Sequence, residues 1–319
     1  MRKKGAAQAA YFGKRVAVIE KEPMPGGAAV HTGTLPSKTL RETALFLSGH
    51  KTGELYGISV SLDHERAVPR LLSRKDAVVH QEVARIHDNL HRHDVTYLRG
   101  TARFVTPHAI ELSGPEGARI VTGEFSLVAT GSVPFQPANI PFEDPDIDDS
   151  DTILKIDRMP ASLTVLGGGV IGCEYAAMFA ALGVKVILIE PRDELLSFLD
   201  AEVSEALRVA LTRLGVDVRL KTSGTDTRRE GNDIVTQLST GDRVATDKFL
   251  FAAGRSGATA SLNLEAIGVK LGKRGYVEVD KVYRTSVPSM SATEPGMSSW
   301  ASVPAMTNAF GPFASSFLR

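Results

Sequence analysis

The sequence predicts an α/β protein with two domains built from βαβ units, the first of them incomplete. Short β-branched runs alternate with helical stretches, as in a parallel sheet covered by helices. One complete unit runs from Leu163 to Glu190, and a half unit ends at Glu20. The segments 126–132 and 249–255 both read as an apolar strand running into small residues and glycine. This internal repeat indicates two related, Rossmann-like domains.

Length and composition fit a multi-domain, water-soluble protein. The chain has 319 residues, with 37 acidic and 37 basic side chains and 43% hydrophobic residues. Zero net charge gives no reason to expect nucleic acid or an anionic membrane as a partner. No apolar run reaches the roughly 20 residues needed to cross a bilayer. The single cysteine, Cys173, excludes an internal disulfide and a thiolate zinc site, so we expect a cytoplasmic protein without a metal site.

Residues 1–150 are expected to form the incomplete domain, with a helical and β-meander segment. An alanine-rich helix closed by Gly13 leads into a strand at 14–20. The segment 40–89 is helical in pattern, with four apolar side chains on one face: Val79, Val83, Ile86 and Leu90. Short strands are expected at 95–98, 109–112, 119–121 and 126–129.

Residues 151–288 are expected to form the complete domain. Its helices are expected to run from the glycine-rich turn to Leu182 and onward from Asp200, which can cap the second helix. Its strands are expected at 163–166, 185–189, 216–220, 234–238 and 249–252. Residues 289–319 differ abruptly in composition, and we assign no element to this tail.

The glycine-rich turn carries the clearest chemical signal. Gly167, Gly169 and Gly172 form a GxGxxG between strand and helix, and Glu190 follows the last of them by 18 residues. The first glycine permits the tight turn, the second lets a pyrophosphate approach the backbone, and the third brings the helix against the strand. The helix N-terminus favours an anion. Glu190 can accept hydrogen bonds from ribose hydroxyls, as for NAD, whereas Arg192 can pair with the 2′-phosphate of NADP.

A second glycine-rich segment follows the strand that ends at Glu20. Residues 26–38 read Gly-Gly-Ala-Ala-Val-His-Thr-Gly-Thr-Leu-Pro-Ser-Lys. By residue type alone this is a turn followed by a helix start, and an ordinary solvated lysine is the favoured interpretation of Lys38. The glycine pair, Thr32 and Ser37 can serve a phosphate or a ribityl chain.

This segment resembles the signature of the FAD-dependent class I pyridine nucleotide-disulfide oxidoreductases. In that family two cysteines occupy the positions of Ala29 and Thr34. Further matches at 100–108, 129–134 and 253–255 extend the resemblance over residues 5–288. Within the family the chain is most similar to the soluble, cysteine-independent transhydrogenases, on the matches at 169–175 and 192–200.

The resemblance implies FAD, NAD(H) and NADP(H) as cofactors, with nicotinamide nucleotides as the small-molecule partners. Without a cysteine pair there is no thiolate route, so it implies hydride transfer from NADPH to NAD through the flavin at one nicotinamide site. It implies catalytic roles for Lys38 and Glu174, as an ion pair near the flavin. The cofactor-binding residues expected from the motif and the resemblance are Glu20, Gly27, Thr32, Gly33, Ser37, Lys38, Ala102, Thr130, Gly131, Gly167, Gly169, Val170, Gly172, Glu190, Arg192 and Gly254.

The chain also departs from the family pattern. Aligned on the strand before Glu20, the family's FAD phosphate loop falls before about Arg2, so we expect that loop to be missing. A Gly-Asp pair of the family is replaced by Glu294 and Pro295, which suggests a slip of the reading frame near Ser289. We also expect the C-terminal interface domain, through which the family forms homodimers or higher oligomers, to be absent.

Two alternative functions stay open at this stage. The chain can be an inactive fragment that binds only NAD(H) through residues 151–288. It can also be a flavin-dependent NAD(P)H reductase, or a protein similar to dihydrolipoyl dehydrogenase, with another electron acceptor. A bound flavin separates the first alternative from transhydrogenation, and reoxidation by NAD separates the second. Cys173 and His31 are expected to have no catalytic role.

Overall fold

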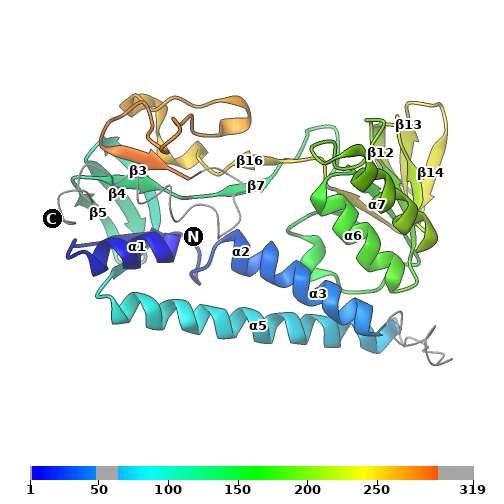
Figure 1. Cartoon of the computed structure of the whole chain (residues 1–319), viewed down its shortest axis with the longest axis horizontal. Coiled ribbons are helices and arrows are strands. Elements are labelled where there is room, and N and C mark those ends of the chain that lie inside the picture. Colours follow the sequence, from blue (N-terminus) through cyan, green and yellow to red (C-terminus); the bar gives the residue numbers. More distant parts are fainter. Residues whose placement is uncertain (1, 48–63, 294–319) are drawn as a thin grey trace. The chain divides into compact units, whose positions relative to one another are not determined.

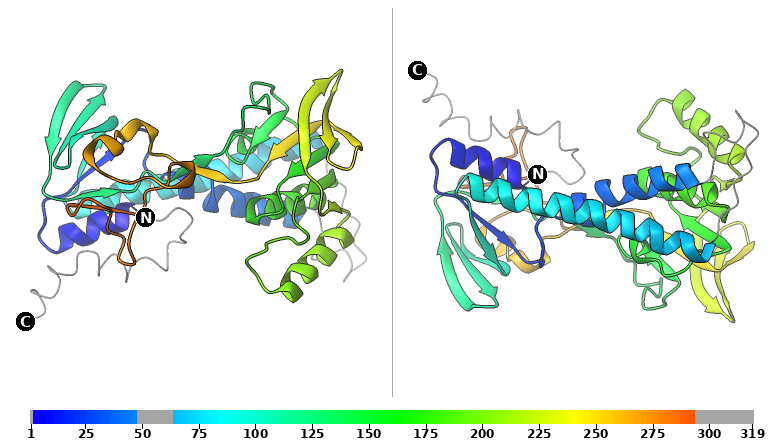
Figure 2. Two further views of the ribbon diagram at one scale, coloured as in Figure 1. Left: turned by 90° about the horizontal axis from the view of Figure 1, so that it is seen from above. Right: turned by 90° about the horizontal axis from the view of Figure 1, so that it is seen from below.

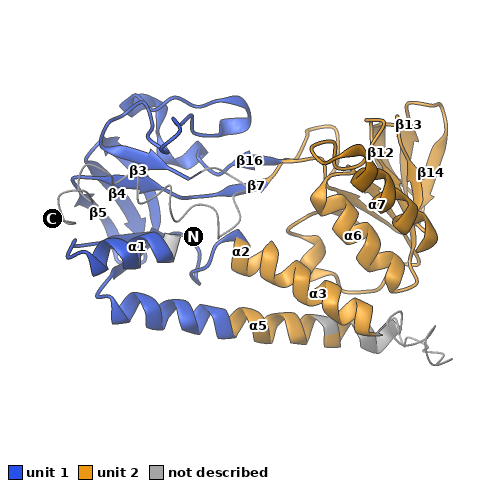
Figure 3. Ribbon diagram, in the orientation of Figure 1, with its two compact units in different colours: residues 1–28, 81–133, 255–319 blue, residues 29–80, 134–254 orange. Residues whose placement is uncertain are grey.

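The computed structural model describes residues 2–47 and 64–293. Within these ranges the chain forms two compact units, shown in two colours in Figure 3. The described part of unit 1 consists of residues 2–28, 81–133 and 255–293. The described part of unit 2 consists of residues 29–47, 64–80 and 134–254. Each unit is therefore assembled from segments that lie far apart in the sequence.

Unit 2 is organised around a parallel five-stranded sheet. The strand order is β11-β10-β9-β15-β8. The strands are β8 (Ile147–Asp149), β9 (Ser162–Leu166), β10 (Lys185–Ile189), β11 (Asp217–Arg219) and β15 (Lys248–Phe251). In register, Leu166 of β9 pairs with Ile189 of β10 and with Phe251 of β15. The β9, β10 and β15 strands lie within one residue of their predicted positions, and the parallel order confirms the Rossmann-like fold.

Helices connect the first three strands of this sheet (Figure 1). The α6 helix (Val170–Ala181) joins β9 to β10, and α7 (Ala201–Arg213) joins β10 to β11. The α3 helix (Thr34–Leu47) packs against α6, since Leu40 and Ala44 share a core with Ala176 and Phe179. Asp200 precedes α7 as predicted, but its side chain makes no cap hydrogen bond, and only its backbone carbonyl accepts from the first turn.

The other face of the parallel sheet packs against an antiparallel sheet. This sheet consists of β12 (Gly224–Glu230), β13 (Asp233–Leu238) and β14 (Arg243–Thr246). Phe249 and Phe251 of β15 share a core with Ile234 and Val244, whereas Leu250 between them belongs to the helical side. Alternate residues of one strand thus cover the two faces, which explains its continuous apolar sequence.

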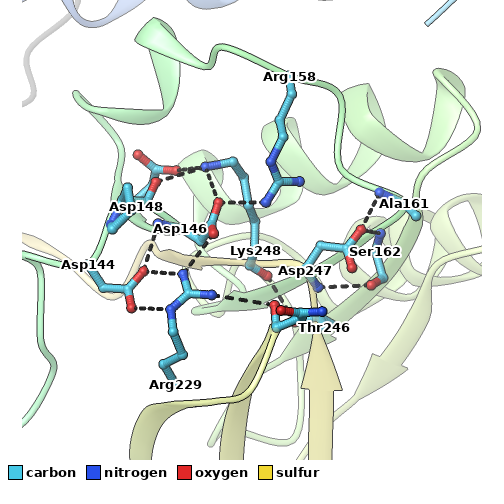
Figure 4. A network of polar contacts seen from close by, with 12 residues as sticks. Asp144, Asp146, Asp148, Arg158, Ala161, Ser162, Arg229, Thr246, Asp247 and Lys248 are labelled. Carbon is cyan, nitrogen blue, oxygen red and sulfur yellow. Dashed lines mark hydrogen bonds and ion pairs between the residues drawn. The ribbon is translucent and has the colours of Figure 1, made fainter.

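Lys248, the first residue of β15, is almost fully buried among acidic side chains (Figure 4). Its Nζ lies 3.1 Å from Asp146 Oδ1 and 3.5 Å from Asp148 Oδ2, and donates to the carbonyl of Pro145 at 3.0 Å. Its side chain is only 3% exposed. A buried ammonium needs such partners because desolvation disfavours its charge.

Two arginines extend this network toward the surface. Asp146 binds Arg158 and Arg229, each at 2.7 Å, and Arg229 also binds both carboxylate oxygens of Asp144. Because Arg229 lies on β12, the network ties the antiparallel sheet to the loop before β8.

The stability of this network should depend on pH. The hydrogen bond from Arg229 holds the pKa of Asp144 below its ordinary 3.8. Burial raises the pKa of Asp146, but its bonds to Arg229 and Lys248 outweigh this and leave it lowered. Since the unfolded chain binds more protons than these folded carboxylates, their contribution is full above about pH 4 and is lost below it. Burial raises the pKa of Asp148, so the contribution of Asp148 to stability changes with pH in the opposite direction.

We therefore expect the unfolding free energies of wild type and an Arg229→Met variant to converge on acidification from pH 7 to pH 3. Urea unfolding at both pH values measures the gap between them. A gap of the same size at both pH values would contradict the assignment of the lowered pKa values to Arg229.

Unit 1 begins with a short helix and a parallel strand pair. The α1 helix (Arg2–Tyr11) ends before Gly13, which has a φ of 75°, and leads to β1 (Ala17–Glu20). β1 pairs with β2 (Thr96–Arg99), so that Glu20 lies opposite Arg99. An antiparallel sheet follows, formed by β3 (Thr101–Thr106), β4 (Ala109–Gly114) and β5 (Gly117–Thr122).

Two further strand pairs bring the end of the described chain into unit 1. β6 (Ser126–Val128) pairs in parallel with β17 (Met290–Ala292), and β7 (Ser132–Pro134) pairs with β16 (Arg255–Gly257). The short helices between β16 and β17 are Ala260–Leu262, Glu265–Ile267 and Lys273–Gly275.

The compact units group the chain differently from the predicted boundaries at 150 and 288. Residues 255–288 belong to unit 1, because Leu262, Val269 and Val287 share a core with Phe104 and Val128. The start of the unassigned tail contributes Met290 to the same core, and the remainder of that tail lies outside the described residues. The boundaries at 150 and 288 stay a prediction about the two nucleotide domains.

The α5 helix (His64–Arg92) is a single long helix, drawn in cyan in Figure 2. Pro69 lies in its second turn, where it removes one backbone N–H donor from the helix. The predicted apolar face is confirmed, since Val79, Val83, Ile86 and Leu90 are all buried. No helix among the described residues is both long enough and apolar enough to cross a bilayer.

Candidate functional site

The glycine loop of unit 2 connects β9 to α6, and two of its glycines are required by close backbone packing. Gly167 has a φ of 119°, and a Cβ there would lie 2.8 Å from the backbone of Ala252. A Cβ on Gly172 would lie 1.8 Å from the carbonyl oxygen of Gly167. Both distances are far below van der Waals contact. The first and third glycines therefore perform the predicted roles of tight turn and close helix packing.

Gly169 differs from its neighbours because the space beside it is open. A Cβ on Gly169 would meet no atom within 4 Å, and its φ of −78° suits any residue. Gly169 is also the N-cap of α6, and no side chain caps the helix there. The first N–H groups of a helix have no intrahelical partners and carry a partial positive charge. Packing within the chain does not require a glycine at position 169. A glycine there leaves space for a group that approaches from outside the chain.

Glu190 follows β10 and is buried, with only 5% of its surface exposed. Its Oε2 accepts a hydrogen bond from the Gly168 N–H at 2.6 Å, and its Oε1 accepts from the Arg192 N–H at 3.0 Å. The sequence places Glu190 beside the glycine loop correctly. Its two backbone partners are a finding of the structure.

Arg192 is exposed two residues later, as a partner for an external anion must be. Its guanidinium donates to Ser197 Oγ at 3.1 Å, on the same loop. This contact uses one N–H of the guanidinium, which has further donors to bind other groups.

An open hollow of about 640 Å³ lies beside β11 and the turn between β13 and β14. Two of the residues that line the hollow are hydrogen-bonded to the backbone of Glu190. The Glu190 N–H donates to the Arg219 carbonyl, and the Thr222 N–H donates to the Glu190 carbonyl. The residues that line it are Val218, Arg219, Leu220, Thr222, Leu238, Thr240, Asp242 and Arg243. None of the predicted site residues is among them.

Cys173 is enclosed in the first turn of α6. Burial, together with the nearby negative charge of Glu190, raises the pKa of its thiol to about 12, and its Sγ lies 3.4 Å from the Gly168 carbonyl. We expect the native protein to react with iodoacetamide at pH 8 about a thousandfold more slowly than the unfolded chain, since the thiolate is the nucleophile. Rapid labelling of the folded protein would show that the thiol is accessible.

The predicted pairing of Lys38 with Glu174 is replaced by another contact within unit 2. Ser37 is buried and its hydroxyl donates to Glu174 Oε1 at 3.4 Å, whereas Lys38 is exposed and has no ion pair with Glu174. The reason is the helical geometry of α3, because successive residues point about 100° apart and only one can face α6.

The predicted FAD residues of unit 1 lie along β1, β3 and the turn after β6. Glu20 is buried at the end of β1, where its Oε1 accepts from the Glu22 N–H at 3.3 Å. Its backbone carbonyl accepts from Gly100, so Ala102 on β3 follows two residues after this contact. Thr130 and Gly131 line a small crevice of unit 1, and Gly27 has the left-handed φ of 59° that its turn requires.

Other predicted FAD residues belong to unit 2. Thr32 and Gly33 lie between the short α2 helix (Ala28–His31) and α3, and the Gly33 carbonyl accepts from the Ser37 N–H. Gly254 ends unit 2 with a φ of 129°, and its carbonyl accepts from the Phe135 N–H. Val170, which the sequence assigns to the nicotinamide-nucleotide loop rather than to FAD, is exposed as the first residue of α6.

Sequence reasoning missed the residues that hold the glycine loop from outside. Leu196 donates its N–H to the Gly168 carbonyl at 3.1 Å and has a φ of 47°, which is rare for leucine. A Cβ on Gly168 would lie 2.6 Å from Leu195 Cδ2. A third consecutive glycine in the motif was the available signal, because GxGxxG does not require one at that position.

Comparison with known proteins places this geometry in a family context. The family model described as "Pyridine nucleotide-disulphide oxidoreductase" matches residues 4–293. Soluble pyridine nucleotide transhydrogenase of Mycobacterium bovis is 39% identical over 91% of this chain, and that of Pseudomonas paraeruginosa is 38% identical over 90%. The chain spans 62% of the length of both relatives.

Solved structures agree with the fold. The flavoprotein disulfide reductase RclA of Escherichia coli, as a Cu(II) complex, superimposes with a TM-score of 0.84 at 28% identity, covering 98% of this chain and 68% of RclA. LpdA of Mycobacterium tuberculosis gives a TM-score of 0.84 at 25% identity, covering 99% of this chain and 69% of LpdA.

Proposed function

Because this chain belongs to the pyridine nucleotide-disulphide oxidoreductase family, we propose that it carries out FAD-dependent hydride transfer between NADPH and NAD. The relatives named soluble pyridine nucleotide transhydrogenase support this proposal. The flavin and nicotinamide groups supply the hydride chemistry when bound, and the chain binds and orients them.

The open space beside Gly169 is the observation that carries the nucleotide half of the proposal. Contacts within the chain exclude a Cβ at Gly167 and at Gly172, whereas a Cβ at Gly169 would meet no atom within 4 Å. We propose that a pyrophosphate binds there, at the N-terminus of α6, where backbone N–H groups can donate to anions. Exposed Arg192 stands near the end of β10, where a 2′-phosphate distinguishes NADP from NAD.

The flavin half rests on residues whose chemistry fits FAD. Buried Glu20 at a strand end has a carboxylate suited to ribose hydroxyls, and its backbone lies next to the start of β3 with Ala102. Gly27, Thr130 and Gly131 complete the set in unit 1. In unit 2, Thr32, Gly33, Ser37, Lys38 and Gly254 are likewise proposed to bind a cofactor.

The absence of a usable thiol selects hydride transfer over disulfide reduction. Ala29 and Thr34 stand where the family signature has cysteines, and Cys173 is buried with a raised pKa. Thiol-disulfide exchange needs a thiolate, so we propose that electrons move through the cofactors by hydride transfer. The same single cysteine supports a cytoplasmic location.

Catalytic roles remain proposed for Lys38 and for Glu174, without an ion pair between them. The Ser37 hydroxyl holds Glu174 from α3, and the adjacent exposed Lys38 is free to place its ammonium toward negative charge that develops on a bound cofactor.

A Gly169→Ala variant tests the nucleotide site. We expect its melting temperature to stay within about 2 °C of wild type, because the new Cβ meets no atom of the chain. We expect NADH to bind at least about tenfold more weakly, because the methyl group occupies the space proposed for the pyrophosphate. Unchanged NADH affinity, measured by titration calorimetry, would place the nucleotide elsewhere.

A further inference from the structure

We propose that Lys221, the second residue after β11, is a specificity residue that binds the 2′-phosphate of NADP together with Arg192; this rests on the nucleotide site proposed above. An acid at the position of Glu190 can accept hydrogen bonds from ribose hydroxyls and so favours NAD. Its negative charge also repels a 2′-phosphate. A single site that exchanges hydride between NADPH and NAD therefore needs cations that offset this charge when NADP is bound.

Lys221 and Arg192 lie side by side at the carboxyl end of the parallel sheet of unit 2. The neighbouring strands β10 and β11 end in register. Just beyond them, the Lys221 N–H donates to the Arg192 carbonyl at 2.8 Å, and the Thr222 N–H donates to the Glu190 carbonyl at 3.1 Å. Nucleotides bind at the carboxyl ends of such strands. Lys221 therefore lies beside both residues through which the proposed site distinguishes NAD from NADP.

Neither cation is neutralised by another residue in the part of the chain that the structure describes. Lys221 is exposed and its ammonium makes no hydrogen bond or ion pair there, and the Arg192 guanidinium donates only to the Ser197 hydroxyl. Asp193 and Glu194 belong to the same loop as Arg192, but neither of them forms an ion pair with the two cations. Both positive charges are thus available to a phosphate, which binds cations through charge-assisted hydrogen bonds.

The backbone of Lys221 has a conformation that lysine rarely adopts. Its φ is 53°, in the left-handed region that favours glycine and asparagine. Residues held in such conformations cluster at ligand sites. Glycine or asparagine would form this turn at lower cost, so the turn alone does not explain a lysine here. A phosphate that binds its ammonium does.

The comparison of Lys221→Gln with Lys185→Gln tests the proposal. Both residues are exposed lysines of unit 2 without an ion pair among the described residues, but Lys185 begins β10, at the amino end of the sheet. We expect NADPH to bind about tenfold more weakly to Lys221→Gln than to wild type, because the 2′-phosphate loses a charge-assisted contact. NADH affinity should stay within about twofold of wild type. Lys185→Gln should bind both nucleotides like wild type, and Lys221→Arg should keep most of the NADPH affinity because it keeps the charge.

Titration calorimetry at two salt concentrations provides a second readout. The gap in NADPH affinity between wild type and Lys221→Gln should narrow between about 0.05 M and about 0.5 M salt, because salt screens exposed charges. Lys221→Gln that binds NADPH like Lys185→Gln, or that loses NADH and NADPH equally, would overturn the proposal. Wild type that binds NADH but not NADPH would overturn it too. Wild type that binds neither nucleotide would instead overturn the nucleotide site itself, and the proposal with it.

Discussion

Replacing Lys248 with methionine should destabilise unit 2 by about 3–5 kcal/mol. Methionine keeps most of the apolar stem but removes the ammonium that faces Asp146 and Asp148. Asp148 would then be a buried carboxylate without its cationic partner, which is the costly case for broken buried ion pairs. Urea unfolding followed by circular dichroism measures the change.

Arg228→Ala is the matched control for this experiment. Arg228 pairs with Asp226 and Glu230, but its side chain is 60% exposed. Exposed pairs contribute about 0–1 kcal/mol, so the control should change stability little. A Lys248→Met variant as stable as Arg228→Ala would show that the buried network contributes no more than surface charge.

Gly172→Ala should cost about 3 kcal/mol or more and abolish nucleotide binding. The added Cβ would lie 1.8 Å from the Gly167 carbonyl oxygen, so α6 must move away from the turn that it packs against. That movement displaces the N–H groups at the start of the helix. Thermal melting and NADH titration report the two effects together.

Gly169→Ala provides the contrast, since the same methyl group there meets no atom of the chain. Together the variants separate a glycine needed by the fold from one needed by the ligand. A Gly172→Ala protein with normal melting and normal NADH affinity would mean that α6 does not pack against the turn as described.

The parts of the fold that local pattern encodes could be predicted from the sequence. The strands β9, β10 and β15 and the loop between β9 and α6 follow from apolar runs and glycine spacing. The buried face of α5 follows from helical periodicity. These features depend on residues close in sequence, so a single chain carries enough information to place them.

The features that escaped prediction depend on distant pairings. The Lys248 network joins residues about a hundred positions apart, and the three alternating aspartates at 144, 146 and 148 give no hint of a buried lysine. Residues 255–288 return to unit 1 because their short apolar clusters match the core around Phe104, which no periodicity reveals.

Within the site, the sequence located the glycine loop and its acid but not their mutual contacts. Spacing places Glu190 beside the loop, yet only the geometry shows that Gly168 and Arg192 bind its carboxylate. Likewise, the resemblance implies that Lys38 pairs with Glu174, but the rotation of α3 about its axis brings the Ser37 hydroxyl to Glu174 instead. Side-chain direction depends on how helices rotate when they pack, which residue types alone do not specify.

The visible absorption spectrum of the protein with added FAD, recorded anaerobically, tests the proposed hydride transfer most directly. NADPH is added first and NAD second. The account predicts a flavin band that NADPH bleaches and that NAD restores. A bleached band restored only by another acceptor, such as a quinone, would contradict transhydrogenation, and NADH binding without any flavin band would contradict the flavin half of the proposal.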